Sequence, residues 1–308
     1  MRDILEFAPE ISQALREGRP VVALESTVIA HGLPHPLNLE TAAGMEAIIR
    51  RRGSLPATIA VLDGKIKIGL TESERERVGT GRNITKASLR DLPVLLSRQG
   101  SGATTVSATA HLAAQAGIRV FATGGIGGVH RGWEKTLDIS ADLPALAHTP
   151  IVTVCAGAKS VLDLPATLEW LETHGVPVLG FRTDHFPAFY TQKTDPPLPV
   201  DARVEIAQEV ADMFKMRQKL RLQGGVLVCV PVPQDFALSS REVEGFIKSA
   251  LQDAADQQVK GRDVTPFLLK ALAETTGGRS LTANRALLEN NAAVAANISK
   301  AINPPQYV

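Results

Sequence analysis

A lysine follows one of the most apolar strand candidates of the sequence. In IVTVCAGAKSVLD, residues 151–163, apolar and β-branched residues favour a buried strand, and small residues at 156–158 allow a tight turn before Lys159. A helix is predicted from Ser160 onward. Because open α/β sheets place their chemistry where strands end, Lys159 is either a charged rim residue or a working amine. The apolar strand before it and a helix N-terminus after it would both favour the neutral, nucleophilic amine.

A glutamate occupies a similar position in VVALESTVIAHGLPHP, residues 21–36. Glu25 directly follows a predicted buried strand, and burial there would raise its pKa and suit it to donate a proton. Ser26 and Thr27 are expected either to bind a substrate or to cap the turn. His31 and His35 are four residues apart, but the intervening prolines argue against a single helix, so a zinc site is not expected.

Five glycines lie between Gly124 and Gly132 in FATGGIGGVHRGWEKTLDISADLP, residues 121–144. The spacing does not match a dinucleotide fingerprint, because His130 occupies the third glycine position, and there is no phosphate-binding Gly-Lys-Ser/Thr. We expect a loop that cradles an anion or a substrate, with His130 and Arg131 as additional donors. A flexible surface loop is the alternative.

The same segment contains Asp138 and Asp142, which would share one face of a helix. Paired carboxylates suit a divalent cation such as Mg²⁺ or Mn²⁺, or general acid–base catalysis. A helix N-cap at Ser140 or Asp138 explains the pattern equally well.

Three further segments have features of a binding site. In residues 81–93, Arg82, Lys86 and Arg90 would line one face if the segment were helical, either to bind a phosphate or as a solvated charged face. Residues 99–117 predict an alanine-rich helix whose N-terminus suits a phosphate, with close packing as the alternative. Residues 280–299 predict a helix in which one or more asparagines face a polar site or solvent: Asn284, Asn290 and Asn291.

Short apolar strands alternate with longer helical patterns along the chain. Strands are predicted at Val21–Leu24, Thr58–Leu62, Ile66–Leu70, Val120–Thr123, Ile151–Val154, Val178–Thr183 and Val226–Val230. Asp63–Lys65 predicts a hairpin, residues 241–257 a helix, and the proline-rich residues 190–201 a loop. This alternation predicts an α/β protein, with a mainly parallel mixed sheet covered by helices on both faces, in one large domain spanning residues 1–308.

Composition excludes several classes of function. The 308 residues are 44% hydrophobic, and 33 basic and 32 acidic side chains leave a net charge of +1. Such a balance argues against binding to nucleic acid or to a membrane surface. Cys155 and Cys229 lie in apolar runs and are expected to be buried thiols. We find no signal-peptide pattern and no apolar run long enough to span a membrane, so a cytoplasmic protein is expected.

Taken in order, the segments resemble the pseudouridine-5′-phosphate glycosidase family over essentially the whole chain. The resemblance is carried by VALEST, HGLP, PATIAVLDGKIKIGL, ITKASLRDLP, GATTVSAT, VFATGGIGGVHRG, DISADL, VCAGAKSVLDL, TPFLL and SLTANRALLENNA. It implies an α/β/α fold, a homotrimer, and a divalent metal ion, usually Mn²⁺. The implied reaction is the reversible conversion of pseudouridine 5′-phosphate and water to uracil and ribose 5-phosphate.

The resemblance also implies roles for individual residues. Lys159 corresponds to the nucleophile that forms a Schiff base with C1′ of the sugar, Glu25 to the proton donor, and Asp138 to the metal ligand. The implied substrate-binding residues are Lys86, Val106, Ser140, Ala141 and Asp142, together with Thr123, His130 and Asn284.

The chemistry of a C-glycoside explains why an amine is needed. The leaving atom is a ring carbon, a poor leaving group, and an iminium at C1′ provides the electron sink for cleavage of the carbon–carbon bond. Ordinary glycosidases instead use two carboxylates.

Three other functions remain open: an indigoidine-synthesis A-like relative acting on another C-glycoside, a catalytically silent sugar-phosphate sensor, and a dinucleotide oxidoreductase. A sensor would need phosphate contacts but no amine nucleophile, and the glycine spacing makes the oxidoreductase the weakest of the three.

Overall fold

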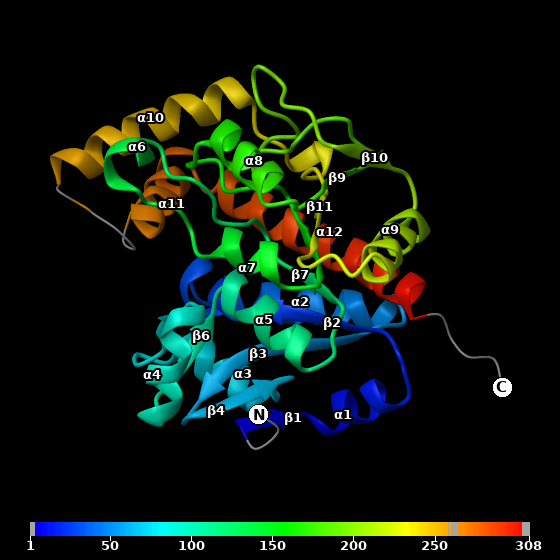
Figure 1. Cartoon of the computed structure of the whole chain (residues 1–308). Coiled ribbons are helices and arrows are strands. Elements are labelled where there is room, and N and C mark those ends of the chain that lie inside the picture. The colour runs from blue at the N-terminus through cyan, green and yellow to red at the C-terminus, as the bar shows by residue number, and fades with distance from the viewer. Residues whose placement is uncertain (1–3, 258, 260–263, 304–308) are drawn as a thin grey trace.

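The computed structural model describes residues 4–257, 259 and 264–303, which form an α/β domain around a mixed, mainly parallel sheet (Figure 1). The central path of the sheet runs β1-β4-β3-β2-β7-β8-β11-β9-β10, and β6 pairs with β3 and β5. Its strands are β1 (Leu5–Phe7), β2 (Val21–Glu25), β3 (Leu55–Leu62), β4 (Lys65–Ile68), β5 (Thr85–Ala87), β6 (Gly102–Thr104), β7 (Val120–Ala122), β8 (Val152–Cys155), β9 (Val178–Phe181), β10 (Ala202–Val204) and β11 (Val226–Cys229). The predicted fold class is therefore confirmed.

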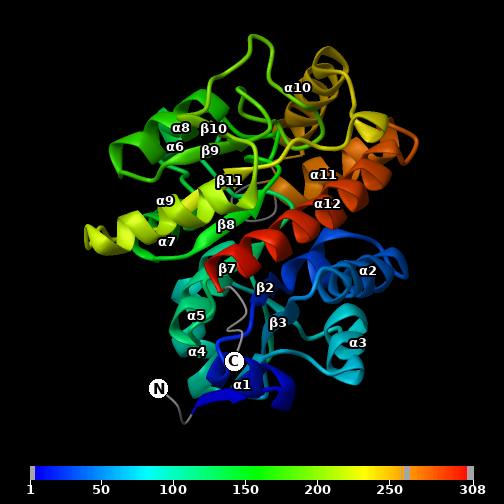
Figure 2. The same cartoon turned by 90° about the vertical axis from the view of Figure 1, so that its right-hand side faces the viewer.

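Helices cover the sheet on both faces. They are α1 (Pro9–Arg16), α2 (Leu37–Arg51), α3 (Glu72–Thr80), α4 (Leu92–Ser97), α5 (Val106–Gln115), α6 (Trp133–Thr136), α7 (Asp142–His148), α8 (Leu164–Thr173), α9 (Ala207–Lys219), α10 (Ser240–Asp256), α11 (Val264–Thr275) and α12 (Arg279–Ile302). Helix α12 packs on β2, β7 and β8 and contacts α2 and α9, whereas α5 packs on β2 and β7 and contacts α7. In Figure 2, α5 and α7 lie on one side of β2 and β7, and α2 and α12 on the other.

The β3–β4 hairpin follows from its two turn residues. Asp63 and Gly64 both have positive φ, 49° and 74°, as a type I′ turn requires, and the flanking Leu62 and Lys65 are register partners. The hairpin prediction is confirmed, and it gives the sheet one of its antiparallel pairings.

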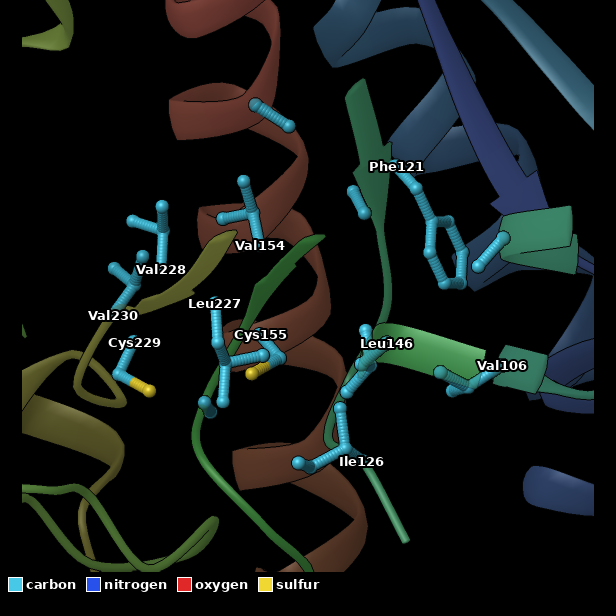
Figure 3. Packing of buried hydrophobic residues seen from close by; sticks show 14 of the residues in the cluster. Val106, Phe121, Ile126, Leu146, Val154, Cys155, Leu227, Val228, Cys229 and Val230 are labelled. Atoms are coloured by element: carbon cyan, nitrogen blue, oxygen red, sulfur yellow. The ribbon is translucent and has the colours of Figure 1, made fainter. Parts of the chain in front are cut away.

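The main hydrophobic core lies on both faces of the sheet, between the strands and the helices that cover them. Its strand residues on β7, β8 and β11 are completely or almost completely buried, as expected for parallel strands covered on both faces. Figure 3 shows members of this core from Val106 on α5 to Val230 beyond β11, with the two predicted buried thiols, Cys155 and Cys229, among them.

Two segments differ in local structure from what was considered or predicted from the sequence. Residues 81–93 do not form one helix, because Thr85–Ala87 is strand β5, paired with β6, and Leu89–Asp91 is a 3₁₀ turn, so Arg82, Lys86 and Arg90 do not share a helical face. The helix expected from Ser160 begins only at Leu164, where Asp163 caps α8 by accepting a hydrogen bond from the Ala166 N–H at 3.0 Å. Lys159 therefore lies in a turn and not at a helix N-terminus.

Other predictions hold. Residues 190–201 form an irregular loop, residues 241–257 lie almost entirely in α10, and the asparagine-bearing segment lies in α12. Among the helices described, none is both long and apolar enough to cross a membrane.

Candidate active site

The carboxyl ends of three adjacent parallel strands form the floor of the site. Leu24 of β2 pairs with Ala122 of β7, which in turn pairs with Val154 of β8. The residues that follow these partners therefore meet at one edge of the sheet: Glu25, Thr123 and the turn that leads from Cys155 to Lys159. This is the edge at which open α/β sheets bind ligands.

A cavity at this edge brings together four of the predicted site residues. Glu25, Lys86, Lys159 and Asn284 line it, although they come from β2, β5, the turn after β8, and α12. The rest of its lining is Thr27, Val28, His31, Gly32, Gly124, Gly125 and Phe189. A nucleophilic amine and an acid in one concave site suit covalent catalysis assisted by proton transfer.

Two hydroxyl groups hold the carboxylate of Glu25. Thr27 Oγ1 donates a hydrogen bond to Oε2, and Thr123 Oγ1 donates to Oε1. Burial raises the pKa of Glu25, while the nearby positive charge of Lys159 and the two hydroxyl donors oppose this rise without cancelling it. A carboxyl group with a raised pKa is suited to donate a proton near neutral pH.

The turn that carries Lys159 is tightly constrained. Its Lys159 N–H donates to the carbonyl of Ile126 at 3.1 Å, which ties the turn to the glycine-rich loop. Gly157 has φ +78°, and a Cβ there would lie 2.0 Å from the carbonyl oxygen of Pro187. Only glycine fits this position, so the amine is presented from a rigid backbone.

The glycine-rich loop uses many of its N–H groups within the protein. Ile126 N–H donates to Gly157 O at 3.1 Å, Val129 N–H to Thr167 Oγ1 at 3.0 Å, and Gly127 N–H to Asp142 Oδ2 at 2.8 Å. These N–H groups are not available to an anion. Instead, the loop contributes Gly124 and Gly125 to the wall of the cavity.

The two aspartates of DISAD have different surroundings. Asp142 is the first residue of α7, is 6% exposed, and accepts hydrogen bonds from Gly127 N–H and Ser107 N–H, so it connects the glycine-rich loop to the start of α5. Asp138 precedes the helix, and its side chain is 42% exposed. Because α7 begins at Asp142 and Asp138 lies before it, the two aspartates do not share a helix face. Ser140 does contribute to the helix start, since its Oγ accepts from Asp142 N–H at 3.2 Å.

His130 lies between Asp138 and the lysines. Its Nδ1 is 3.8 Å from Asp138 Oδ2. Burial lowers the pKa of His130, the Asp138 carboxylate opposes this, and the positive charges of Lys159 and Lys86 add to it. A lowered pKa keeps the imidazole neutral at neutral pH, able to donate or accept a hydrogen bond.

The donors near Asp138 fit a metal ion only if solvent supplies most ligands. Within the described residues, no three His, Cys, Asp or Glu side chains gather as a metal site. Mg²⁺ commonly binds through one or two carboxylates and several waters, and the exposed carboxylate of Asp138 suits that arrangement.

The remaining predicted residues are placed as follows. Val106 is the first residue of α5 and is 2% exposed, with its side chain in the core, so only its backbone could contact a ligand. Ala141 is exposed at the start of α7. Asn291 of α12 has a structural role, because its side-chain amide donates to Thr123 O at 2.8 Å.

Several lining residues are not assigned to the site by the sequence pattern, and three of them have side chains that matter here. The sequence predicts Thr27 only as a substrate contact or a turn residue, whereas in the structure it binds Glu25. His31, which the sequence places only in an unlikely zinc pair, lies in the π-helical turn Val28–Gly32, and burial and the charge of Lys86 lower its pKa. Phe189 lies in a segment without any sequence motif for a site. The signal for the first two was their position directly after the strand that ends in Glu25.

Comparison with known proteins defines the class of protein. The model of the family "Indigoidine synthase A like protein" matches residues 10–301, and the chain belongs to this family.

Its relatives include two pseudouridine-5′-phosphate glycosidases. That of Geobacillus kaustophilus is 52% identical over 98% of this chain and 100% of its own length, and that of Caldanaerobacter subterraneus is 53% identical over 98% of each chain. Among solved structures, the prealnumycin C-glycosynthase AlnA in complex with ribulose 5-phosphate matches with a TM-score of 0.90 at 42% identity over 97% of each chain. An indigoidine synthase A-like protein from Thermotoga maritima matches with a TM-score of 0.87 at 38% identity over 96% of this chain and 95% of its own.

Proposed function

We propose that this protein is a pseudouridine-5′-phosphate glycosidase, which cleaves pseudouridine 5′-phosphate to uracil and ribose 5-phosphate. The observation that carries the proposal is the cavity in which Lys159 and a half-buried Glu25 with a raised pKa face one ligand space. It is supported by relatives of that name at about half identity over nearly the whole chain. The role is in nucleotide catabolism.

The first step opens the ribose ring. Glu25 donates its proton to the ring oxygen as the bond between that oxygen and C1′ breaks, and the amine nitrogen of Lys159 forms a bond to C1′. The Glu25 carboxylate that remains then takes up the proton that the attached nitrogen loses. Thr27 and Thr123 hold both oxygens of Glu25 and so fix the direction in which the proton is delivered.

The second step breaks the carbon–carbon bond. The nitrogen lone pair of Lys159 forms an iminium with C1′, the C1′–C5 bond breaks, and its electron pair stays with the uracil ring, which takes up a proton at C5. Water then hydrolyses the iminium, which releases ribose 5-phosphate and regenerates the amine. Burial of Glu25 and its proximity to Lys159 suit it to return protons between these steps.

Lys86 and the DISAD segment are assigned to the phosphate end of the substrate. Lys86 of β5 lines the cavity and provides a positive charge for the phosphate. Ser140, Ala141 and the backbone at Val106 complete this end, with Asp142 joining the loops that carry them. Binding the remote phosphate would hold C1′ against Lys159.

We also propose Mn²⁺, or another divalent cation such as Mg²⁺, held by Asp138 and water, with His130 beside it. When bound, such an ion would supply positive charge near the phosphate and sugar oxygens. A homotrimer in the cytoplasm completes the proposal, and the homotrimer rests on the resemblance described above.

A second candidate function is the synthesis of a different C-glycoside. The match to AlnA, a prealnumycin C-glycosynthase, favours it, because that protein shares the fold at 42% identity. The two activities would share Lys159 and differ in the leaving or accepting ring.

Turnover of pseudouridine 5′-phosphate tests the proposal. The purified protein with Mn²⁺ should release uracil and ribose 5-phosphate in equal amounts, detected by proton NMR, and the reverse mixture should form the C-glycoside. Lys159→Ala should reduce the rate by at least about 10³-fold, as expected when a nucleophile is removed. A wild-type protein that binds ribose 5-phosphate but releases no uracil would favour the sensor or the C-glycosynthase.

A further inference from the structure

The segment at residues 186–190 places one phenyl ring in the active-site cavity. Phe189 lines this cavity together with Lys159, Gly124 and Gly125 and is 4% exposed. Among the described residues that line the cavity, its side chain is the only one with a phenyl ring. The segment carries no sequence motif, and the proposed chemistry leaves it without a role.

The backbone at Phe189 is held in a conformation that phenylalanine rarely adopts. Its φ is +60°, in the left-handed region that is unfavourable for a bulky residue. The Phe189 N–H donates to the carbonyl of Ala156 at 3.0 Å, and Gly157 forms a β-bridge with Ala188. The turn that carries the nucleophile and the turn that carries the ring are therefore joined, and strain maintained in this way is often found at functional sites.

One glycine makes room for the ring. A Cβ on Gly125 would lie 2.5 Å from Cδ2 and 2.7 Å from Cε2 of Phe189, whereas a Cβ on Gly124 would lie at an ordinary contact distance of 3.4 Å from Cε2. The ring edge thus rests directly on the backbone of Gly125. Phe189 belongs to the main core and also packs edge-to-face on Tyr190, with ring centroids 4.7 Å apart at 84°. Filling the core alone would not require both a left-handed backbone and a glycine beneath the ring.

We propose that Phe189 is the stacking wall for the planar base of the substrate and determines specificity for C-glycosides with a flat ring. This inference rests on the proposed function. When C1′ is bonded to Lys159, the base attached to C1′ lies in the same cavity, and a phenyl ring fixed beside it offers an apolar face to the base. Stacking on an aromatic side chain is sequence-tolerant and strengthens binding of a base by about 5- to 150-fold.

The test compares two ligands that differ in flatness. Uracil and 5,6-dihydrouracil present the same amide edge, but saturation at C5 and C6 makes dihydrouracil puckered. Each is used to inhibit release of ribose 5-phosphate from pseudouridine 5′-phosphate, and the ratio of the two inhibition constants is measured in the wild type and in Phe189→Leu. Leucine remains apolar and has no aromatic face.

We expect dihydrouracil to bind about tenfold more weakly than uracil in the wild type, and the ratio to fall to about twofold in Phe189→Leu. Phe186→Leu is the matched control, because Phe186 is completely buried in the same segment and does not line the cavity. Its ratio should stay at the wild-type value. A merely structural role of Phe189 would change both inhibition constants together and leave their ratio unchanged.

Two results would overturn the inference. Phe189 is not a stacking wall if Phe189→Leu keeps the wild-type ratio of inhibition constants. The same conclusion follows if the wild type does not distinguish uracil from dihydrouracil. This comparison within the wild type can be made even if the variant does not fold. If the wild type turns over pseudouridine 5′-phosphate in the same assay, the proposed function survives either result. If it releases no uracil at all, the proposed function fails and the inference fails with it.

Discussion

The hydroxyl of Thr27 is one of the groups that lower the proton affinity of Glu25, and removing it should change the pH profile in a definite direction. Glu25 must be protonated to act as the acid, so activity is lost as pH rises through its pKa. Burial raises this pKa, and the hydroxyls of Thr27 and Thr123 oppose the rise by donating to the carboxylate. In Thr27→Val, one donor is lost at nearly constant side-chain volume, and the pKa of Glu25 should rise further.

The size of the change follows from the hydrogen bond that is lost. A hydrogen bond to a charged group contributes about 1.5–3 kcal/mol. Since one pKa unit corresponds to about 1.36 kcal/mol, the alkaline limb of kcat/KM should move upward by about one to two pH units. At pH values below the alkaline limbs of both proteins, the rate of Thr27→Val should be lower than that of the wild type, because a single hydroxyl then holds the carboxyl group of Glu25.

The assay is uracil release from pseudouridine 5′-phosphate between pH 5 and about 10. Thr27→Ser keeps the hydroxyl and should restore the wild-type limb. Thr80→Val is a control away from the site, because the Thr80 hydroxyl donates to Glu76 O on the exposed face of α3. An unchanged or lowered alkaline limb in Thr27→Val would refute the assignment of Glu25 as the acid held by Thr27.

Three further outcomes are expected. Gly157→Ala should lower the free energy of unfolding by about 2–4 kcal/mol in a denaturant titration, because φ is +78° there and the new Cβ would lie 2.0 Å from a carbonyl oxygen. Gly117→Ala is the control: φ is +89° but the space around it is open, so the free energy of unfolding should fall by only about 1 kcal/mol. Equal losses in the two variants would contradict the packing argument. In thermal melts, Glu25→Gln should gain stability over the wild type between pH 5 and pH 8. A carboxyl group whose pKa is raised on folding makes the folded wild-type protein less stable as pH rises from 4.5 through the folded pKa, and glutamine does not titrate. A stability difference between the two proteins that does not depend on pH would show that the proton affinity of Glu25 does not change on folding. Asp138→Ala should raise the Mn²⁺ concentration for half-maximal rate by at least about tenfold, and an unchanged metal response would remove Asp138 as the ligand.

The long strands could be predicted from the sequence because each has its own apolar pattern. β2, β3, β8 and β11 are runs of four to eight residues whose burial is visible in composition alone. The three-residue strands β5 and β6 could not be found this way, because Thr85–Ala87 becomes a strand only by pairing with Gly102–Thr104, which in turn pairs with β3. This pairing, and not a helix, places Lys86 at the cavity.

The site was predictable where chemistry follows a strand and unpredictable where a residue acts through tertiary contacts. Glu25 and Lys159 could be assigned because strand ends mark the active edge of an α/β sheet. The pattern of Asp142 suggests a ligand, but both of its oxygens accept backbone N–H groups, one from the glycine-rich loop and one from the first turn of α5. Phe189 had no local signal, since its place in the cavity depends on a left-handed backbone joined to the turn before Lys159.

The central claim is that Lys159 forms a covalent iminium with the sugar, and reductive trapping tests it most directly. The protein is incubated with ribose 5-phosphate and Mn²⁺, reduced with borohydride, and digested for peptide mass spectrometry. The account predicts a reduced ribose 5-phosphate adduct on Lys159 and its absence in Lys159→Ala. An adduct on another lysine, or none in a protein that demonstrably binds ribose 5-phosphate, would contradict it.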